Sequence, residues 1–260
     1  MRKILLLMFS ILSVSSYSYV ERNEQVGSRG LELMRESNIN QNMELSKESG
    51  STQIIDAYRG SGKFAKTKGF MIGTTSNFVA YPNITAGVTV AYDKYKYKPD
   101  NNDHWGRDYD VNTYFSYKLN KNLFMLGFGY SQARHVEKRA YIGNLEYGRF
   151  LTGNTYLYTG VEGQNRIYKG EGSMNLRFAN YKLGLLRQDT WKKLKFVNGI
   201  EVNTDNRKYD VEDRGRENLT FVSRLSYYIY DDLLLDVQYR GTKNRKFYDN
   251  VVGLGFTHYF

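Results

Sequence analysis

The feature that most constrains the fold is a two-residue alternation of side chains from residue 51 to the carboxy-terminus. Apolar runs facing small or polar residues are separated by clusters of Asn, Asp, Gly and Lys. Such alternation is typical of β-strands, whose successive side chains point to opposite faces of a sheet. It predicts twelve strands, over residues 52–59, 64–77, 84–97, 109–119, 123–134, 140–151, 155–167, 176–187, 194–205, 219–230, 233–243 and 248–260.

The connections between these strands alternate in length. Tight turns are predicted at Tyr81-Pro82-Asn83, Asn120-Lys121-Asn122, Thr152-Gly153-Asn154 and Asp231-Asp232. Longer charged connections are predicted at residues 98–108, 135–139, 168–175, 206–218 and 244–247. Short turns at one end and long loops at the other are typical of outer-membrane β-barrels. We therefore expect an all-β fold, an antiparallel transmembrane β-barrel of about twelve strands, in the outer membrane of a Gram-negative bacterium.

The composition agrees with a barrel better than with a soluble β-sandwich. The mean hydropathy is −0.60, although 15% of the residues are aromatic. Inward polar residues dilute the membrane signal of a barrel in this way. Tyrosines on the apolar face near the predicted strand ends, where an interfacial girdle belongs, include Tyr92, Tyr109, Tyr117, Tyr130, Tyr227 and Tyr239. The chain has no cysteine, which excludes disulfides and thiol chemistry.

The first 50 residues differ from the rest. Residues 1–18 predict a secretory signal peptide, with Arg2 and Lys3 before a short apolar run and with Ser16 and Ser18 before the cleavage site. Residues 19–50 are polar. Their sparse apolar residues fit a helix over residues 29–47, and a solvated linker is the alternative. The barrel is expected over residues 51–260.

The last strand carries an assembly signal. Large apolar residues share one of its faces, at Val252, Leu254, Phe256 and Phe260. A terminal Phe after alternating apolar residues resembles the last strand of bacterial outer-membrane barrels, which implies recognition by the barrel insertion machinery. His258 departs from that pattern.

A more specific resemblance covers residues 29–260. The segment Gly62-Lys-Phe-Ala-Lys-Thr-Lys-Gly-Phe-Met-Ile-Gly73, the segment Asn83-Ile-Thr-Ala-Gly-Val-Thr-Val-Ala-Tyr92 and the carboxy-terminal strand are similar to the β-domain of autotransporters. In that family a helix lies inside the barrel and a passenger domain is carried outside. The resemblance therefore implies a lumen helix, formed here by residues 29–47. Because only about ten residues precede that segment after the signal, we expect no passenger.

The inner wall is the candidate functional site. The predicted inward faces carry both signs of charge, and we expect the following residues to line the lumen: Asp110, Lys118, Glu146, Glu162, Lys182, Lys195, Glu201, Arg224, Asp236 and Arg240. Burying such charges in a narrow barrel is costly unless they pair or stay wet. The near balance favours ion pairs around water or around an inserted segment. These pairs are either purely structural or a selectivity filter.

Three functions remain open. The first is a pore or translocator-like barrel with a narrow or plugged lumen. The second resembles small twelve-strand porins for acidic oligosaccharides, which the net charge of +10 favours. The third is an outer-membrane protease or lipase, for which Asp108-Tyr-Asp110, Asp103-His104 and His258 are candidates without suitable partners.

We expect no enzymatic activity, no cofactor and no metal. The expected partners are outer-membrane lipid and lipopolysaccharide, in addition to the insertion machinery. The basic residues are dispersed over strand ends and loops, so we expect no nucleic-acid binding.

Overall fold

The computed structural model describes residue 39 and residues 51–62, 65–78, 80–97, 106–133, 137–169, 174–204, 217–243 and 248–259. The predicted signal peptide and Phe260 lie outside the described residues. Of residues 29–47, only Ile39 is described. No helix within the described ranges is long and apolar enough to cross a membrane.

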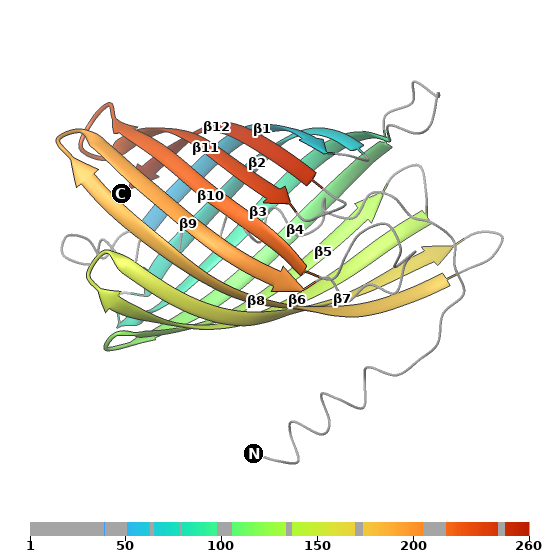
Figure 1. Cartoon of the computed structure of the whole chain (residues 1–260), viewed down its shortest axis with the longest axis horizontal. Coiled ribbons are helices and arrows are strands. Elements are labelled where there is room, and N and C mark those ends of the chain that lie inside the picture. The colour runs from blue at the N-terminus through green and yellow to red at the C-terminus, as the bar shows by residue number, and fades with distance from the viewer. Residues whose placement is uncertain are drawn as a thin grey trace, which may run out of the picture.

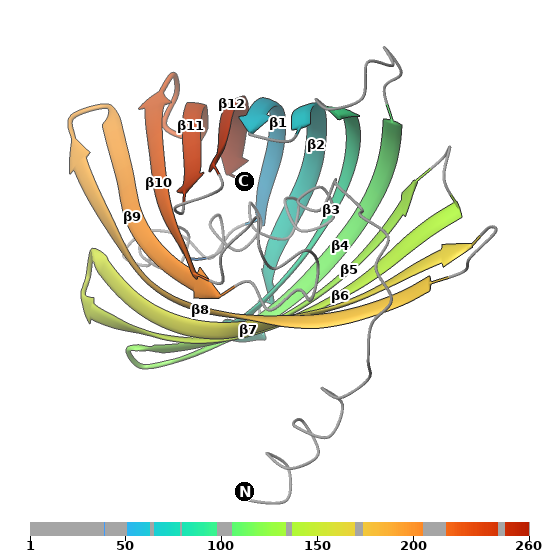
Figure 2. The same cartoon turned by 45° about the vertical axis from the view of Figure 1, so that its right-hand side comes forward.

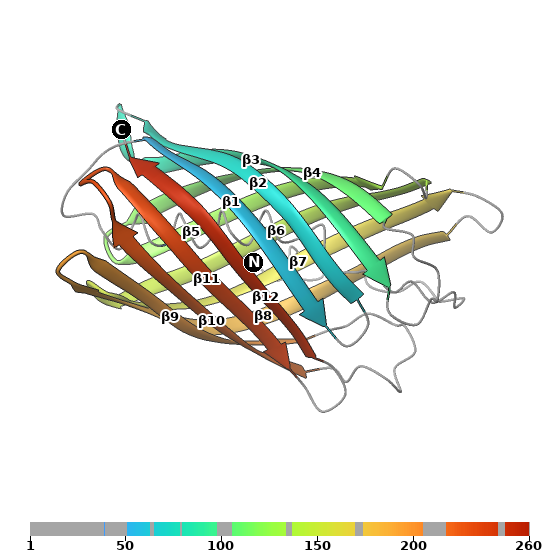
Figure 3. The same ribbon diagram turned by 90° about the horizontal axis from the view of Figure 1, so that it is seen from above.

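Twelve strands form one closed barrel, as predicted (Figure 1). Every strand pairs antiparallel with its neighbours in the chain, and β12 closes the barrel against β1. Figure 3 shows these two strands side by side, and Figure 2 shows the wall curving from β1 through β7 to β12. The strands are β1 (Ser51–Gly62), β2 (Ala65–Phe78), β3 (Tyr81–Tyr97), β4 (Gly106–Leu119), β5 (Asn122–Ala133), β6 (Glu137–Thr152), β7 (Thr155–Lys169), β8 (Met174–Trp191), β9 (Leu194–Thr204), β10 (Glu217–Tyr228), β11 (Leu233–Lys243) and β12 (Tyr248–Tyr259).

The two ends of the barrel differ. At one end, named the turn end here, the connections are residues 79–80, 120–121, 153–154, 192–193 and 229–232. Two of these turns use a left-handed backbone, at Asn120 (φ 54°) and Lys192 (φ 52°). At the opposite loop end the connections include residues 98–105 and 205–216. Short turns of outer-membrane barrels are periplasmic, so we expect the loop end to be the external one.

One predicted turn is wrong. Tyr81-Pro82-Asn83 belongs to the start of β3, and the turn conformation is found at Ala80, directly before this strand. The register of β2 with β3 shifts between Asn77 and Phe78, where Tyr81 pairs with Phe78. Such an irregularity at a strand end is where a sheet tolerates a proline. β8 pairs continuously with β7 through the Arg177–Asn165 pair, and Arg177 is exposed.

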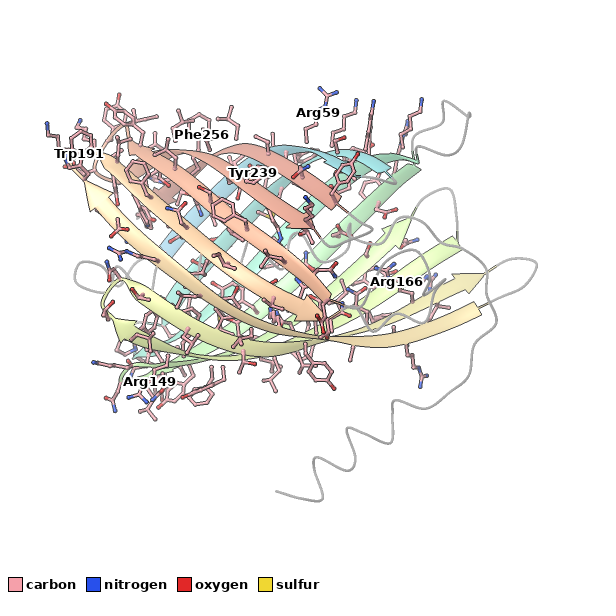
Figure 4. The ribbon with its side chains drawn as sticks, in the orientation of Figure 1. Arg59, Arg149, Arg166, Trp191, Tyr239 and Phe256 are labelled. Carbon is pink, nitrogen blue, oxygen red and sulfur yellow. The ribbon has the colours of Figure 1, made fainter. Side chains whose placement is uncertain are left out.

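The outer face is apolar. Exposed side chains such as Ile72, Leu126, Leu183, Ile200 and Leu254 cover it, and Figure 4 shows Phe256 projecting from the wall. Rings contact one another between adjacent strands, with centroid distances of 5.1 Å for Phe124–Tyr147 and 5.4 Å for Tyr130–Tyr141. An apolar wall with aromatic residues toward its edges is suited to a lipid bilayer.

Candidate functional site: the inner wall

Buried and exposed side chains alternate along each strand, and the buried ones form the inner wall. All ten charged residues predicted to line the lumen occupy inward positions, on β4 and on β6 to β11. Six are buried, whereas Lys118, Glu162, Arg224 and Arg240 are half-buried. The three described residues of the predicted assembly signal, Val252, Leu254 and Phe256, are exposed on the outer face of β12.

Six of the ten charges form three ion pairs. Lys182 Nζ lies 3.1 Å from Glu146 Oε2, Arg224 Nη2 lies 2.6 Å from Asp236 Oδ2, and Arg240 Nη2 lies 3.3 Å from Glu201 Oε1. Further hydrogen bonds satisfy the same carboxylates. Thr257 Oγ1 donates to Asp236 Oδ2 over 2.6 Å, and Arg224 Nη2 also donates to Thr257 Oγ1 over 2.8 Å. Such added bonds offset the cost of removing both charges from bulk water.

The other four charges have different surroundings. Lys118 Nζ lies over the Phe150 ring, 4.9 Å from its centroid, and Glu162 Oε1 accepts a 2.6 Å bond from Gln164 Nε2. Lys195 is buried on β9, near the turn end. Asp110 is fully buried toward the loop end, where Asp108 on the same face pairs in register with Asp93 of β3.

Several inner contacts join strands that are not neighbours, by crossing a glycine on the strand between them. The Glu146–Lys182 pair links β6 to β8 over Gly160, and Tyr158 of β7 donates to Glu201 of β9 over Gly184. A Cβ on Gly184 would lie 2.3 Å from the Tyr158 ring.

The same arrangement spans the junction of the first and last strands. Gln238 of β11 bonds Asp56 of β1 over Gly253 of β12, and Tyr58 of β1 bonds Asp93 of β3 over Gly69 of β2. We name these four contacts the glycine bridges. They tie strands two apart along the circumference of the barrel.

An apolar shelf on the inner wall was missed by the sequence analysis. It consists of six buried side chains on β5 to β8 near the turn end, namely Leu123, Met125, Phe150, Tyr156, Tyr158 and Leu186. Tyr156 and Tyr158 stack with their centroids 5.6 Å apart. The available signal was the loss of alternation at Leu123-Phe-Met-Leu126 and Tyr156-Leu-Tyr158, where both faces are apolar.

Ile39 packs on this shelf. Its side chain is 0% exposed and belongs to the same cluster of buried residues, and its backbone is helical. Because the shelf side chains face inward, Ile39 lies inside the barrel. It is the one described residue of the segment for which a lumen helix was predicted.

The candidate catalytic residues are not assembled into a site by the described part of the chain. Asp103 and His104 lie outside the described residues. His258 Nε2 lies 3.3 Å from Asp232 Oδ2 at the turn end, and this pair is largely exposed. Within the described ranges, no group of three or more His, Cys, Asp or Glu side chains is placed to hold a metal ion.

No protein-family model matches the chain, and the curated proteins give no match. Solved structures match its fold. The translocator domain of the autotransporter NalP from Neisseria meningitidis is 12% identical with a TM-score of 0.58, covering 92% of this chain and 100% of that chain. The β-domain of the Bordetella autotransporter BrkA is 10% identical with a TM-score of 0.57, covering 81% and 99%.

Channels share the fold as well. An outer-membrane channel from Pseudomonas putida F1 is 9% identical with a TM-score of 0.58, covering 82% of this chain and 96% of that chain. At these identities the likeness is one of fold. Together with the apolar outer face and the charged inner wall, it shows that the chain is an outer-membrane β-barrel similar in fold to autotransporter translocator domains.

Proposed function

We propose that the chain is a narrow, translocator-type pore whose lumen is plugged by its own residues 29–47. The observation that carries this proposal is the position of Ile39, fully buried against the apolar shelf. Burying an isoleucine side chain contributes about 1.5–3 kcal/mol. An open, water-filled lumen would leave the shelf wet, so the shelf is best explained as the seat of the plug.

The charges of the wall support a role with little ion preference. Each of the three ion pairs sets a cation against a carboxylate within 3.3 Å. Opposite charges this close cancel well within the Debye length, which is about 8 Å at physiological salt. The proposed role is therefore passage of small solutes when the plug is displaced, or simple residence in the membrane. We propose no catalytic role.

A channel for anionic solutes, such as acidic oligosaccharides, is the second candidate. It is favoured by the net charge of +10 and by the likeness in fold to the Pseudomonas putida channel. The pairing of Arg224 with Asp236 and of Arg240 with Glu201 weighs against it, because paired guanidinium groups attract anions weakly.

Single-channel recording on the refolded mature chain distinguishes the two. Deleting residues 19–50 should turn a weakly conducting barrel into an open pore. Ile39→Asp should raise the conductance in the same direction, because a carboxylate cannot stay on the apolar shelf. Ile39→Leu is the matched control and should conduct as the parent does.

The anionic channel predicts a different result. Full and truncated chains would conduct equally and would prefer anions, and Arg224→Gln with Arg240→Gln would reduce that preference. Equal, anion-selective conductance of the two chains would therefore reject the plug and leave the channel as the better explanation.

A further inference from the structure

The outer face of the barrel carries a row of basic side chains on four adjacent strands. In the register of the sheet, Arg59 of β1 pairs with Lys68 of β2 and Lys68 pairs with Lys94 of β3. Lys94 pairs in turn with Arg107 of β4. We name these four residues the basic row. A second basic pair, Lys66 with Lys96, lies next to it on the side of the loop end.

The basic row points to the outside of the barrel. Its members alternate with the inward residues Tyr58, Asp93 and Asp108, which are buried. Figure 4 shows Arg59 projecting away from the wall, toward the loop end. The outward positions described in β1 to β4 hold no acidic residue.

An aromatic row lies directly below the basic row. Phe70 pairs with Tyr92 and Tyr92 with Tyr109, with ring centroids 5.8 Å and 5.1 Å apart. Lys94 Nζ lies 5.9 Å from the centroid of the Tyr92 ring. Aromatic side chains at the edge of an apolar wall mark the level of the lipid headgroups. The basic row is therefore at the headgroup level of the external leaflet.

An aliphatic row follows below the aromatic one. Ile55, Ile72, Val90 and Val111 are paired in sequence across the same four strands, and all are exposed. Together the basic, aromatic and aliphatic rows form a strip on the outer face of β1 to β4. From the loop end toward the turn end, this strip presents positive charge, then aromatic rings, then aliphatic side chains. This order matches a lipid that has a strongly anionic headgroup above its acyl chains.

We propose that this strip binds a phosphorylated glycolipid of the external leaflet, with its phosphates on the basic row and its acyl chains on the aromatic and aliphatic rows. Like charges directly opposite one another destabilise a sheet unless an anion offsets them. Arginine and lysine both bind phosphate, and arginine can do so through two parallel hydrogen bonds. The proposal rests on the location in the outer membrane and is independent of the plug.

The test measures binding of bisphosphorylated lipid A to the refolded mature chain in detergent, by native mass spectrometry. Binding should weaken with rising salt, and dephosphorylated lipid A with the same acyl chains should bind at least about tenfold more weakly. Neutralising the basic row should weaken binding by about fivefold for each charge removed. The variant is R59Q/K68Q/K94Q/R107Q.

A matched control removes as many positive charges from the turn end, in the variant K121Q/R149Q/K192Q/K193Q, and should bind as the parent does. Folding of each variant is checked by heat-modifiable migration in gels. The milder R59Q/R107Q provides a second measurement should the first variant misfold. Equal binding of the two lipids, equal loss in the control, or equally tight binding of inorganic phosphate would each overturn the proposal.

Discussion

Replacing Gly184 by alanine tests the glycine bridges most directly. The added methyl group would lie 2.3 Å from both Cζ and the hydroxyl oxygen of Tyr158. The ring would have to move by roughly 1 Å to reach an ordinary contact distance. Lifting the ring from the wall also takes its hydroxyl away from Glu201, to which it now donates a 2.8 Å hydrogen bond.

Two costs follow from that displacement. Overpacking costs about 1–3 kcal/mol, and a lost hydrogen bond to a charged group costs about 1.5–3 kcal/mol. We therefore expect Gly184→Ala to lower the free energy of unfolding by about 2.5–6 kcal/mol. Urea unfolding of the refolded barrel, followed by circular dichroism, measures the change.

Gly163 provides the matched control, because a Cβ there would meet nothing within 4 Å. Gly163→Ala should leave the stability unchanged or raise it by about 0.5–1 kcal/mol, as expected for a strand glycine. In a Tyr158→Ala background the cost of Gly184→Ala should disappear, since the clashing ring is gone. Two results would refute the bridge. One is an equal loss of unfolding free energy in Gly163→Ala and Gly184→Ala, and the other is an undiminished loss from Gly184→Ala in the Tyr158→Ala background.

Three further predictions concern the wall, the plug and assembly. Asp236→Ala should cost about 3–5 kcal/mol of unfolding free energy, because it removes the buried carboxylate that pairs with the half-buried Arg224 inside the barrel. Asp189→Ala is the control: it breaks the exposed pair of Asp189 with Arg187, 2.9 Å apart, and should hardly change the urea midpoint. Equal losses of stability in the two variants would contradict the prediction. A short bifunctional thiol reagent should crosslink Ile39→Cys to Met125→Cys within one chain but not to Tyr248→Cys on the outer face, in a chain with no native cysteine. Deleting Phe260 should sharply lower the yield of the protein in outer-membrane fractions. A normal yield would contradict the predicted assembly signal.

The strands were predictable because their physics is local. Alternating faces and the spacing of turn residues indicated twelve strands with ends close to those observed. The errors come from residues whose local preference was overruled. Pro82 favours a turn, but the register shift beside Phe78 accommodates it in β3. At Gln188–Trp191 the polar and charged residues obscured the extension of β8 to Trp191, which pairs with Leu194.

The inner wall was predictable as a surface but not as a set of contacts. Two-residue periodicity assigns Glu146, Lys182 and Glu201 to the inward face. It does not indicate that Glu146 meets Lys182 across an intervening strand, because that depends on the register of three strands at once. The apolar shelf was missed for a related reason, since its purpose becomes visible only when Ile39 lies against it.

The bridge from Gln238 to Asp56 has a consequence for the order of events in assembly. It joins β11 to β1 across Gly253, so it can form only after β12 has taken its place between them. Every strand pair except β1 with β12 joins consecutive strands, which can pair as the chain is added. The contact across Gly253 is therefore among the last to form, and it fastens the barrel from the inside once the final strand has arrived. Sideways release of β12 must break this bridge as well as the backbone bonds on both edges of the strand.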